Sequence, residues 1–337
     1  KSILYINPPA FCTTVERLVA PALRGRPLAV APPGADRATI LALSPEAEAA
    51  GITRGMLVRT ARKLCPDLIL RPPNPYLYAR ASRALHQILR LYAPVIEPRG
   101  YGHAFLDLSG TDRLFGPAIA VAERIRRESR DRLRLPLTVG IAINKLVSEA
   151  ATRAGRLEAG TPGHRREETG PLLVAGGGEA PFLAPRPMAV LPDVPDAIRI
   201  RLDEYQLERI GQVAAIAESE LCAVFGARGR ILRAWSCGID ARPVLPPEVQ
   251  AEFRLSHTLA TDSNDQGVLC ALLRRFTDAL GLRLRHRHLA ARRLTVQVDY
   301  ADHTTAARAV ALSEGLLDQE LYAAAQRALA TTLTRRI

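Results

Sequence analysis

The strongest constraint on the fold comes from two short apolar stretches that lie far apart in the chain. Residues 2–9 (SILYINPP) and 101–110 (YGHAFLDLSG) have the composition of strands that end in turn-forming residues. Each stretch also carries polar groups at the point where the strand stops. We predict that the two strands pair with each other and that the rest of the chain is organised around this pair.

Further periodic patterns predict an α+β sheet around that pair. Residues 76–92 have apolar side chains on one face and arginines elsewhere, as an amphipathic helix does. Residues 118–133 form a second predicted helix, whose arginines are interpreted as a solvated face. A strand at 137–143 and a helix at 144–154 follow. Strands and helices in this order are typical of a ferredoxin-like α+β fold.

Length and charge bound the class of protein. The chain has 337 residues, of which 47% are hydrophobic and 24% are charged, and it is too long for one compact core. We therefore expect two to four domains. Lys and Arg outnumber Asp and Glu by 46 to 34, which gives a net charge of +12. This excess favours a polyanionic partner, with nucleic acid first and an anionic membrane surface second.

Targeting patterns and cysteine spacing indicate an intracellular protein. No run of about 18 apolar residues predicts a transmembrane span, and the N-terminus lacks the pattern of a signal peptide. The five cysteines are widely spaced and include no C-x-x-C pair. Neither a disulfide framework nor a zinc site is predicted from that spacing. We expect a soluble cytoplasmic protein that does not associate with membranes.

Several motifs resemble those of Y-family DNA polymerases, the translesion group that includes DNA polymerase IV. Residues 5–16 (YINPPAFCTTVE) and 100–108 (GYGHAFLDL) are similar to two palm-strand motifs of that family. Residues 41–52 (LALSPEAEAAGI) resemble a motif of its fingers, and residues 140–152 (GIAINKLVSEAAT) a further palm motif. Similar segments follow in family order, so the resemblance covers essentially the whole chain.

The resemblance implies the Y-family architecture, an α+β fold with a ferredoxin-like palm, fingers, a helical thumb and a little-finger domain of βαββαβ order. The implied boundaries are a palm at 1–10 and 75–165, fingers at 11–74, a thumb at 166–240, a stiff linker at 241–248 and a little finger at 249–337. The first little-finger strand is expected at 251–259. The last strand is expected to be truncated after Ile337.

The metal-binding carboxylates of the family are all replaced in this chain. The aspartate of the first motif falls on Asn7, and the Asp-Glu pair of the second falls on Gly102 and His103. Mg²⁺ is a hard ion that needs several converging oxygen ligands, which these residues do not supply. Asp107 survives, but one carboxylate does not make a two-metal site. The resemblance therefore implies vestigial catalytic positions, no metal site and no cofactor, with Mg²⁺ expected in the active relatives only.

The positions that hold the incoming nucleotide in the family are altered as well. The tyrosine and arginine that contact its triphosphate fall on Pro45 and Glu48, and the aromatic steric gate falls on Cys12. Glu48 places an anion where a cation is needed, so it would repel a triphosphate. Arg156 takes the place of a basic residue near the phosphates. We expect no nucleotide binding at these four vestigial positions.

DNA contacts are expected in two arginine-rich places. The thumb glycines that approach a DNA phosphate in the family are replaced by Asp193-Val194-Pro195, which removes a donor and adds repulsion. The predicted thumb contacts are instead Arg228 and Arg230. The run at 282–294 (LRLRHRHLAARRL) contains no acid, and its arginines are predicted to contact phosphates. These arginines are Arg283, Arg285, Arg287, Arg292 and Arg293.

The altered sites on otherwise intact motifs are similar to the catalytically degenerate, ImuB-like members of the family. This implies a non-catalytic homologue that binds damaged or primer-template DNA and acts as an adaptor in translesion synthesis and induced (SOS) mutagenesis. The implied partners are a replicative-type polymerase, accessory mutagenesis proteins, and a sliding clamp contacted through residues absent from this chain. A nucleoid-associated location is implied too.

Three alternatives stay open. The first is an active translesion polymerase that recruits displaced carboxylates such as Asp107 and Asp112. The second is a palm of the nucleotide-cyclase type, which also needs two metal carboxylates and leaves the thumb and little finger unexplained. The third is a protein interaction module that does not bind DNA, against which the net charge of +12 argues.

Overall fold

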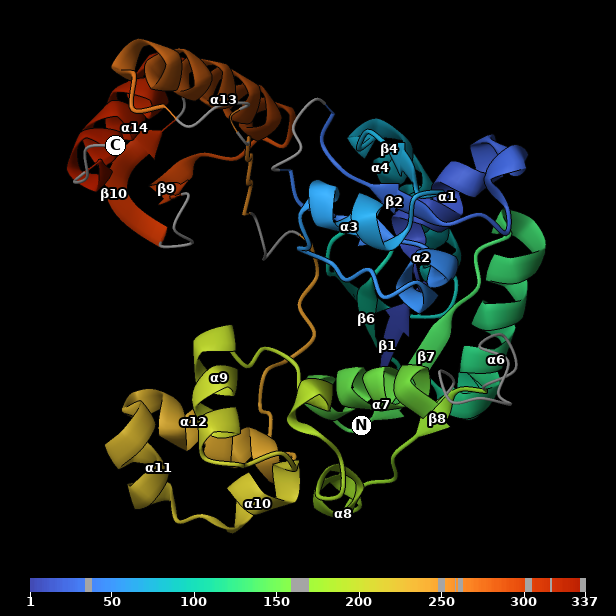
Figure 1. The fold of residues 1–337 in the computed structure, drawn as a ribbon. Helices are drawn as coiled ribbons and strands as arrows, with labels where there is room; N and C mark the ends of the chain where they lie inside the picture. The colour runs from blue at the N-terminus through green and yellow to red at the C-terminus, as the bar shows by residue number, and fades with distance from the viewer. Residues whose placement is uncertain are drawn as a thin grey trace. The chain divides into compact units, whose positions relative to one another are not determined.

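The structure, a computed structural model, describes residues 1–33, 38–158, 170–247, 252–257, 259, 263–300, 305–315 and 317–333. It divides into two units, residues 1–250 and 251–337 (Figure 1). In the described part of the chain, none of the helices is both long and apolar enough to cross a membrane.

A five-stranded sheet forms the centre of the first unit. In chain order its strands are β1 (Ile3–Asn7), β5 (Val95–Pro98), β6 (Ala104–Asp107), β7 (Thr138–Ala142) and β8 (Leu172–Leu173). In space they follow the order β5-β6-β1-β7-β8. The predicted pairing of the two apolar stretches is confirmed, because β1 and β6 are antiparallel neighbours with Tyr5 opposite Phe105.

Two amphipathic helices cover one face of this sheet. The elements on this side are α4 (Pro75–Leu89), α5 (Asp112–Phe115), α6 (Ala118–Glu128) and a π-helical turn, η2 (Ser129–Leu133). Buried residues of α4 and α6 pack against Leu4 and Ile6 of β1. Both predicted helices are therefore present, and the second one runs through α6 and η2.

The other face of the sheet carries α7 (Lys145–Glu158), which packs on β7 and β1. Tyr5 points to this face because side chains alternate along a strand. Gly140, opposite Tyr5 in β7, allows the close approach of α7. A Cβ atom at Gly140 would lie 2.1 Å from the carbonyl oxygen of Ser148. The glycine of the predicted strand–helix motif thus has a packing role.

A smaller, three-stranded sheet lies within residues 28–71 and has the order β3-β2-β4. Its strands are β2 (Leu28–Val30), β3 (Ala42–Leu43) and β4 (Ile69–Arg71). The helices around it are α1 (Phe11–Val19), η1 (Pro21–Leu23), α2 (Pro45–Ala49) and α3 (Val58–Leu64). Its core contains the buried Ile40, Ile52 and Val58.

Short helices between residues 179 and 236 share one core with α7. They are α8 (Glu179–Leu183), η3 (Met188–Val190), α9 (Asp196–Glu204), α10 (Ile210–Ala215), α11 (Glu218–Phe225) and α12 (Ala227–Ser236). Leu146 of α7 belongs to the same buried cluster as Leu202 and Leu232. This shared core fixes the helical segment to the sheet.

The chain after α12 lies against the central sheet. We call residues 238–247 the strap. Val244 is 8% exposed and packs in one cluster with Ile3, Tyr5 and Phe105 on the α7 side of the sheet. We predicted a stiff linker from residue 241, and the described part of that segment belongs to the core of the first unit.

The second unit contains a two-stranded antiparallel sheet and two long helices. In chain order these are α13 (Gln266–His286), β9 (Ala291–Asp299), β10 (Thr305–Gly315) and α14 (Asp318–Thr332). The strand predicted at 251–259 is not formed by residues 252–257, because β9 pairs only with β10 in the described part. The contact to β9 is made instead by a side chain, Arg254, which donates to Gln297 at 3.2 Å. The predicted final strand falls outside the described residues.

Candidate functional site

The three predicted catalytic positions meet at one end of the central sheet. Asn7 is the last residue of β1, and Gly102 and His103 form the turn that leads into β6. The register that pairs Ile6 with Ala104 places Asn7 opposite His103. The structure therefore brings all three positions together.

Gly102 lies in a space that admits no side chain. Its φ of +75° is a left-handed conformation that favours glycine. A Cβ atom there would lie 2.7 Å from Cγ of Pro8 and 2.8 Å from the ring of Phe11. The backbone N–H of Gly102 donates to Oγ of Ser82 at 2.9 Å, which fixes the turn. An aspartate at this position would require Pro8 and Phe11 to move.

His103 is neutral at neutral pH and lies in a basic environment. Its Nδ1 atom is 3.2 Å from the hydroxyl of Tyr5. Burial raises the pKa of Tyr5, so the hydroxyl keeps its proton in this hydrogen bond. Burial and four arginines lower the pKa of His103 to about 4. In decreasing order of effect, these arginines are Arg156, Arg54, Arg153 and Arg99.

The residues at this end of the sheet do not fit a Mg²⁺ ion. Asn7 is buried, and within the described residues its Oδ1 has no hydrogen-bond partner, so it offers one neutral oxygen. His103 offers a nitrogen, and the arginines around it would repel a cation. Over the described ranges, no group of three or more His, Cys, Asp or Glu side chains is placed to hold a metal ion.

The two carboxylates considered as substitutes lie elsewhere. Asp107 is at the opposite end of β6, paired with Ile3, about 13 Å along the strand from His103. One of its oxygens accepts a hydrogen bond from the backbone of Ser109 at 2.8 Å. Asp112 begins α5, beyond that same end of the strand. Neither can join Asn7 and His103 without a rearrangement of the sheet.

The predicted nucleotide positions lie on three helices. Pro45 is the first residue of α2, where proline suits a helix start, and Glu48 is exposed on the same helix. Cys12 is in the first turn of α1, and burial raises the pKa of its thiol to about 11. Arg156 is exposed near the end of α7. Arg54, which we did not predict, acts electrostatically on both Cys12 and His103.

A buried ion pair beside this site was also missed. The Nζ atom of Lys145 lies 2.6 and 2.7 Å from the two carboxylate oxygens of Glu97. Nζ also donates to the carbonyl of Pro243, and the N–H of Leu245 donates to Glu97 at 2.8 Å. The pair therefore holds the strap on the sheet. Nothing in the sequence signals this contact, because the three segments are far apart in the chain.

Asp193 is neutralised by two arginines. Its carboxylate lies 3.1 Å from Arg99 and 2.9 Å from Arg242 of the strap. Burial alone would raise the pKa of Asp193, but Arg242 and Arg99 hold it below the usual value. We predicted that Asp193 repels a DNA phosphate, and these partners remove the basis for that repulsion.

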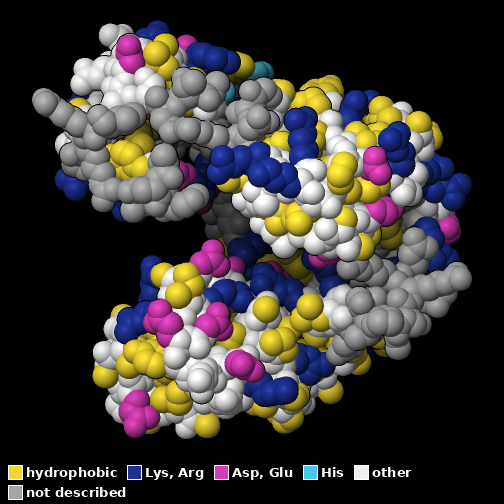
Figure 2. All heavy atoms as spheres, viewed as in Figure 1, with side chains coloured by type: hydrophobic (Ala, Val, Ile, Leu, Met, Phe, Trp, Pro, Cys, Tyr) yellow, Lys and Arg dark blue, Asp and Glu magenta, His cyan; other side chains and the backbone are white. Residues whose placement is uncertain are grey.

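The predicted thumb arginines are exposed at the start of α12. Arg230 forms an ion pair with Glu218 at 2.9 Å, and both side chains are at least half exposed. Figure 2 shows basic and acidic side chains mixed over α9–α12, at the lower left. The helical segment therefore does not present a purely basic face in this view.

The predicted little-finger arginines gather where α13 ends and β9 begins. Arg283, Arg287, Arg292 and Arg293 are exposed there. Arg285 differs, because Asp318 of α14 binds its guanidinium at 2.7 and 3.1 Å. The run has no acid in sequence, but the fold brings one to it. The Arg287 guanidinium also lies 5.9 Å from the centre of the Phe253 ring.

Comparison with known proteins relates the whole chain to one group. Residues 6–153 match the impB/mucB/samB family, and residues 254–337 match the C-terminal domain of that family. DNA polymerase IV of Dehalococcoides mccartyi (strain CBDB1) is 31% identical over 91% of this chain and 76% of its own length. DNA polymerase IV of Halorhodospira halophila is 30% identical over 92% of this chain and 84% of its own length.

Solved structures show the same fold. A Y-family DNA polymerase chimera of Dbh and Dpo4 has a TM-score of 0.80 at 20% identity, and covers 99% of this chain and 94% of its own. DinB from Sulfolobus solfataricus has a TM-score of 0.68 at 20% identity. That match covers 100% of this chain and 95% of the DinB chain. The predicted fold class is confirmed by these matches.

The comparisons also correct one prediction. We predicted that this chain takes no cofactor, with Mg²⁺ in the active relatives only. The relatives it matches over nine tenths of its length are named as DNA polymerases, a class of enzyme that works with Mg²⁺. These relatives contradict the prediction that the chain takes no cofactor.

Proposed function

The chain belongs to the impB/mucB/samB family of Y-family DNA polymerases, and we propose that it is a homologue that binds DNA without itself adding nucleotides. Its role on this proposal is that of an adaptor in translesion synthesis and induced mutagenesis. One observation carries the proposal: the three positions that hold carboxylates in the family have neither an acid nor, at Gly102, the space for one.

The geometry of the site supports the loss of polymerisation in two ways. Metal-assisted phosphoryl transfer needs anionic oxygens that converge on one point, and Asn7 and His103 do not provide them. The arginines that lower the pKa of His103 also make this end of the sheet attractive to anions. Asp107 is bound to the Ser109 backbone at the far end of β6, which speaks against the use of displaced carboxylates.

Retained DNA binding is supported by charge. The net charge of +12 favours a polyanion, and exposed arginines gather at the junction of α13 and β9. We assign residues 1–10 and 75–165 to the palm, 11–74 to the fingers, 166–240 to the thumb and 249–337 to the little finger. The proposed protein partners are a replicative-type polymerase, accessory mutagenesis proteins and a sliding clamp.

The test is a primer-extension assay run beside a DNA-binding titration on one preparation of the full chain. We expect no extension of a primer-template with Mg²⁺ or Mn²⁺ and four deoxynucleotides, while the same DNA is bound. A DNA polymerase IV relative serves as the positive control. Extension that is lost in an Asp107→Asn variant would overturn the proposal in favour of displaced carboxylates. Failure to bind DNA would favour the pure interaction module instead.

A further inference from the structure

An apolar patch is exposed on the helix-covered side of the central sheet. Leu114 is 79% exposed and Leu91 is 59% exposed. Each leucine is followed in the chain by a half-buried aromatic residue, Tyr92 or Phe115, and the centres of these two rings lie 6.3 Å apart. The two leucines are therefore the chain neighbours of two rings that lie close together. Single exposed leucines are common on protein surfaces, but two of them next in the chain to neighbouring rings are the basis for a larger apolar surface.

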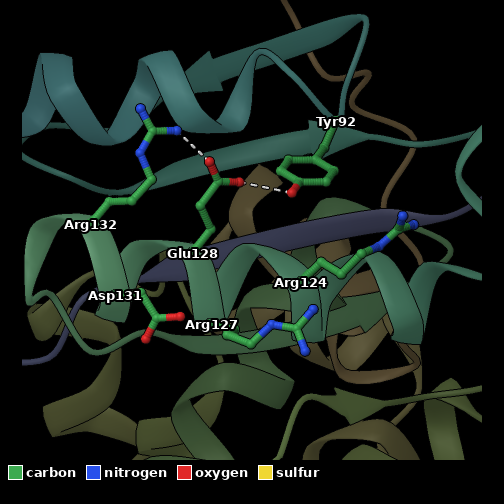
Figure 3. Close-up of a pocket in the computed structure, with 6 residues that line it drawn as sticks. All are labelled: Tyr92, Arg124, Arg127, Glu128, Asp131 and Arg132. Carbon is green, nitrogen blue, oxygen red and sulfur yellow. Dashed lines mark hydrogen bonds and ion pairs between the residues drawn. The ribbon is translucent and has the colours of Figure 1, made fainter.

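A pocket of about 330 Å³ opens beside these rings (Figure 3). It is lined by Tyr92, Arg124, Arg127, Glu128, Asp131 and Arg132. The Arg124 guanidinium lies 5.8 Å from the centre of the Tyr92 ring and donates to the carbonyl of Phe115. It thereby joins the pocket to the apolar residues. We call Leu91, Tyr92, Leu114, Phe115, Arg124 and Arg127 the α5–α6 patch.

The cations of the pocket are not all satisfied by the protein. Glu128 is occupied on both oxygens, by the hydroxyl of Tyr92 at 2.8 Å and by Arg132. The Nε of Arg124 is buried without a hydrogen-bond partner among the described residues. Arg127, one turn further along α6, is exposed and has no hydrogen-bond or ion-pair partner in the described part of the chain. The exposed guanidinium of Arg127 is thus available to an anion, and Arg124 lines the same pocket.

The patch has the composition of a protein-binding surface. Aromatic residues and arginines provide most of the binding energy at interfaces, and they do so where apolar contacts exclude water around them. A nucleic acid is a poorer match, because a phosphate backbone would not cover the leucines.

We propose that the α5–α6 patch binds an acidic peptide segment of a partner protein. Leucine or aromatic side chains of the segment contact Leu91, Leu114 and the two rings, and its carboxylates pair with Arg124 and Arg127. The patch lies on the face of the sheet covered by α4 and α6, whereas Tyr5 and His103 lie on the other face. A partner bound here leaves the vestigial catalytic site open, so the proposal does not depend on the function proposed above.

The experiment uses the full chain and a fluorescein-labelled synthetic peptide in which glutamates alternate with leucines and phenylalanines. Binding is measured by fluorescence anisotropy. Leu114→Ser and Arg127→Ala should each weaken binding roughly tenfold or more, as expected of central contacts. Both side chains are exposed, and unchanged thermal melting would verify that each variant is folded. Leu64→Ser and Arg59→Ala are the matched controls, since these residues are exposed on α3, and both should leave the affinity unchanged.

Two further probes separate the peptide from other ligands. A peptide with glutamine in place of glutamate, and one with serine in place of the apolar residues, should both bind weakly. An oligothymidylate should not compete with the acidic peptide, and its own affinity should not change in Leu114→Ser. Absence of peptide binding, equal binding of the glutamine peptide, or variants no weaker than their controls would overturn the proposal. A loss of oligothymidylate affinity in both patch variants would assign the surface to nucleic acid and overturn it as well.

Discussion

Lys145 and Glu97 form a buried ion pair with Nζ–oxygen distances of 2.6 and 2.7 Å and side chains that are 7% and 1% exposed. The strap completes the pair, because the carbonyl of Pro243 accepts from Nζ and the N–H of Leu245 donates to Glu97. Nζ also lies 5.0 Å from the centre of the Phe105 ring. A pair this buried is stable only while both charges are present.

We therefore expect Glu97→Gln to lower the free energy of unfolding by about 3–5 kcal/mol, because it leaves the Lys145 charge buried and unpaired. Urea denaturation followed by circular dichroism measures this loss. The exposed pair of Arg230 and Glu218 supplies the control, since Glu218→Gln should cost less than about 1 kcal/mol. Equal losses in the two variants would show that the buried pair does not hold the strap.

Gly102 should tolerate no side chain, whereas Gly100 should tolerate one at smaller cost. Both have positive φ, +75° and +77°, so alanine strains the backbone at either position. Only the Gly102 Cβ would meet Pro8 and Phe11, since nothing lies within 4 Å of a Cβ at Gly100. We expect Gly102→Ala to lower the free energy of unfolding by about 1–3 kcal/mol more than Gly100→Ala. Thermal or urea unfolding would reveal the difference, and similar stabilities would refute the steric argument.

The same crowding predicts that simple restoration of the family's acids will fail. A variant with Asn7→Asp, Gly102→Asp and His103→Glu should extend a primer poorly or not at all. The carboxylate that replaces the hydrogen of Gly102 would displace Pro8 and Phe11. On the predicted alignment, Glu48 would also still place a negative charge at the triphosphate position. Robust template-directed synthesis by a folded form of this variant would show that space and charge around the site are not limiting.

His103 should make stability depend on pH in a defined window. Its pKa in the folded protein is about 4, below the usual value of 6.5, because burial and nearby arginines oppose the charge. The unfolded chain therefore takes up a proton at this residue before the folded chain does. The contribution of neutral His103 to the free energy of unfolding is complete above about pH 6.5. It is lost as the pH falls toward 4, by up to about 3 kcal/mol. Unfolding free energies of wild type and His103→Asn, measured across this range, should diverge accordingly. Parallel curves for the two proteins would contradict the lowered pKa of His103. Burial also lowers the pKa of His86, but His86 is present in both proteins, so its contribution cancels in the comparison.

DNA binding should depend on the little-finger arginines other than Arg285, whose guanidinium Asp318 already holds. Changing Arg283, Arg287 and Arg293 together to alanine should weaken binding to all DNA sequences. Removal of each phosphate contact should flatten the slope of log K against log salt by roughly 0.7–0.9. Arg285→Ala should change the slope less than any one of these substitutions. Titrations at several salt concentrations test both statements, and an unchanged slope in the triple variant would exclude this surface.

Patterns along the chain were sufficient for the strands and helices of the central sheet and for the gathering of Asn7, Gly102 and His103, but not for the strand predicted at 251–259. Strand periodicity predicted β1 and β6, and the motif resemblance fixed which residues meet at their ends. The space at Gly102 could not be predicted, because it depends on where Pro8 and Phe11 pack. Local sequence carries no signal for such contacts between separate segments.

Long-range charge pairing was beyond sequence reasoning for the same reason. Arg156, Arg54 and Arg153 act on His103 from separate parts of the chain. Asp318 follows Arg285 by 33 residues and still neutralises it. An acid-free run in sequence therefore does not make an acid-free surface, and a predicted linker can be part of a core when one of its apolar residues, Val244, finds a site.

The docking of the strap also decides how far the first unit extends along the chain. Leu245 is bound to Glu97, so the backbone fixed to the central sheet continues to that residue rather than ending with α12. A substitution that breaks the pair of Lys145 and Glu97 would therefore release a segment of backbone as well as destabilise two side chains.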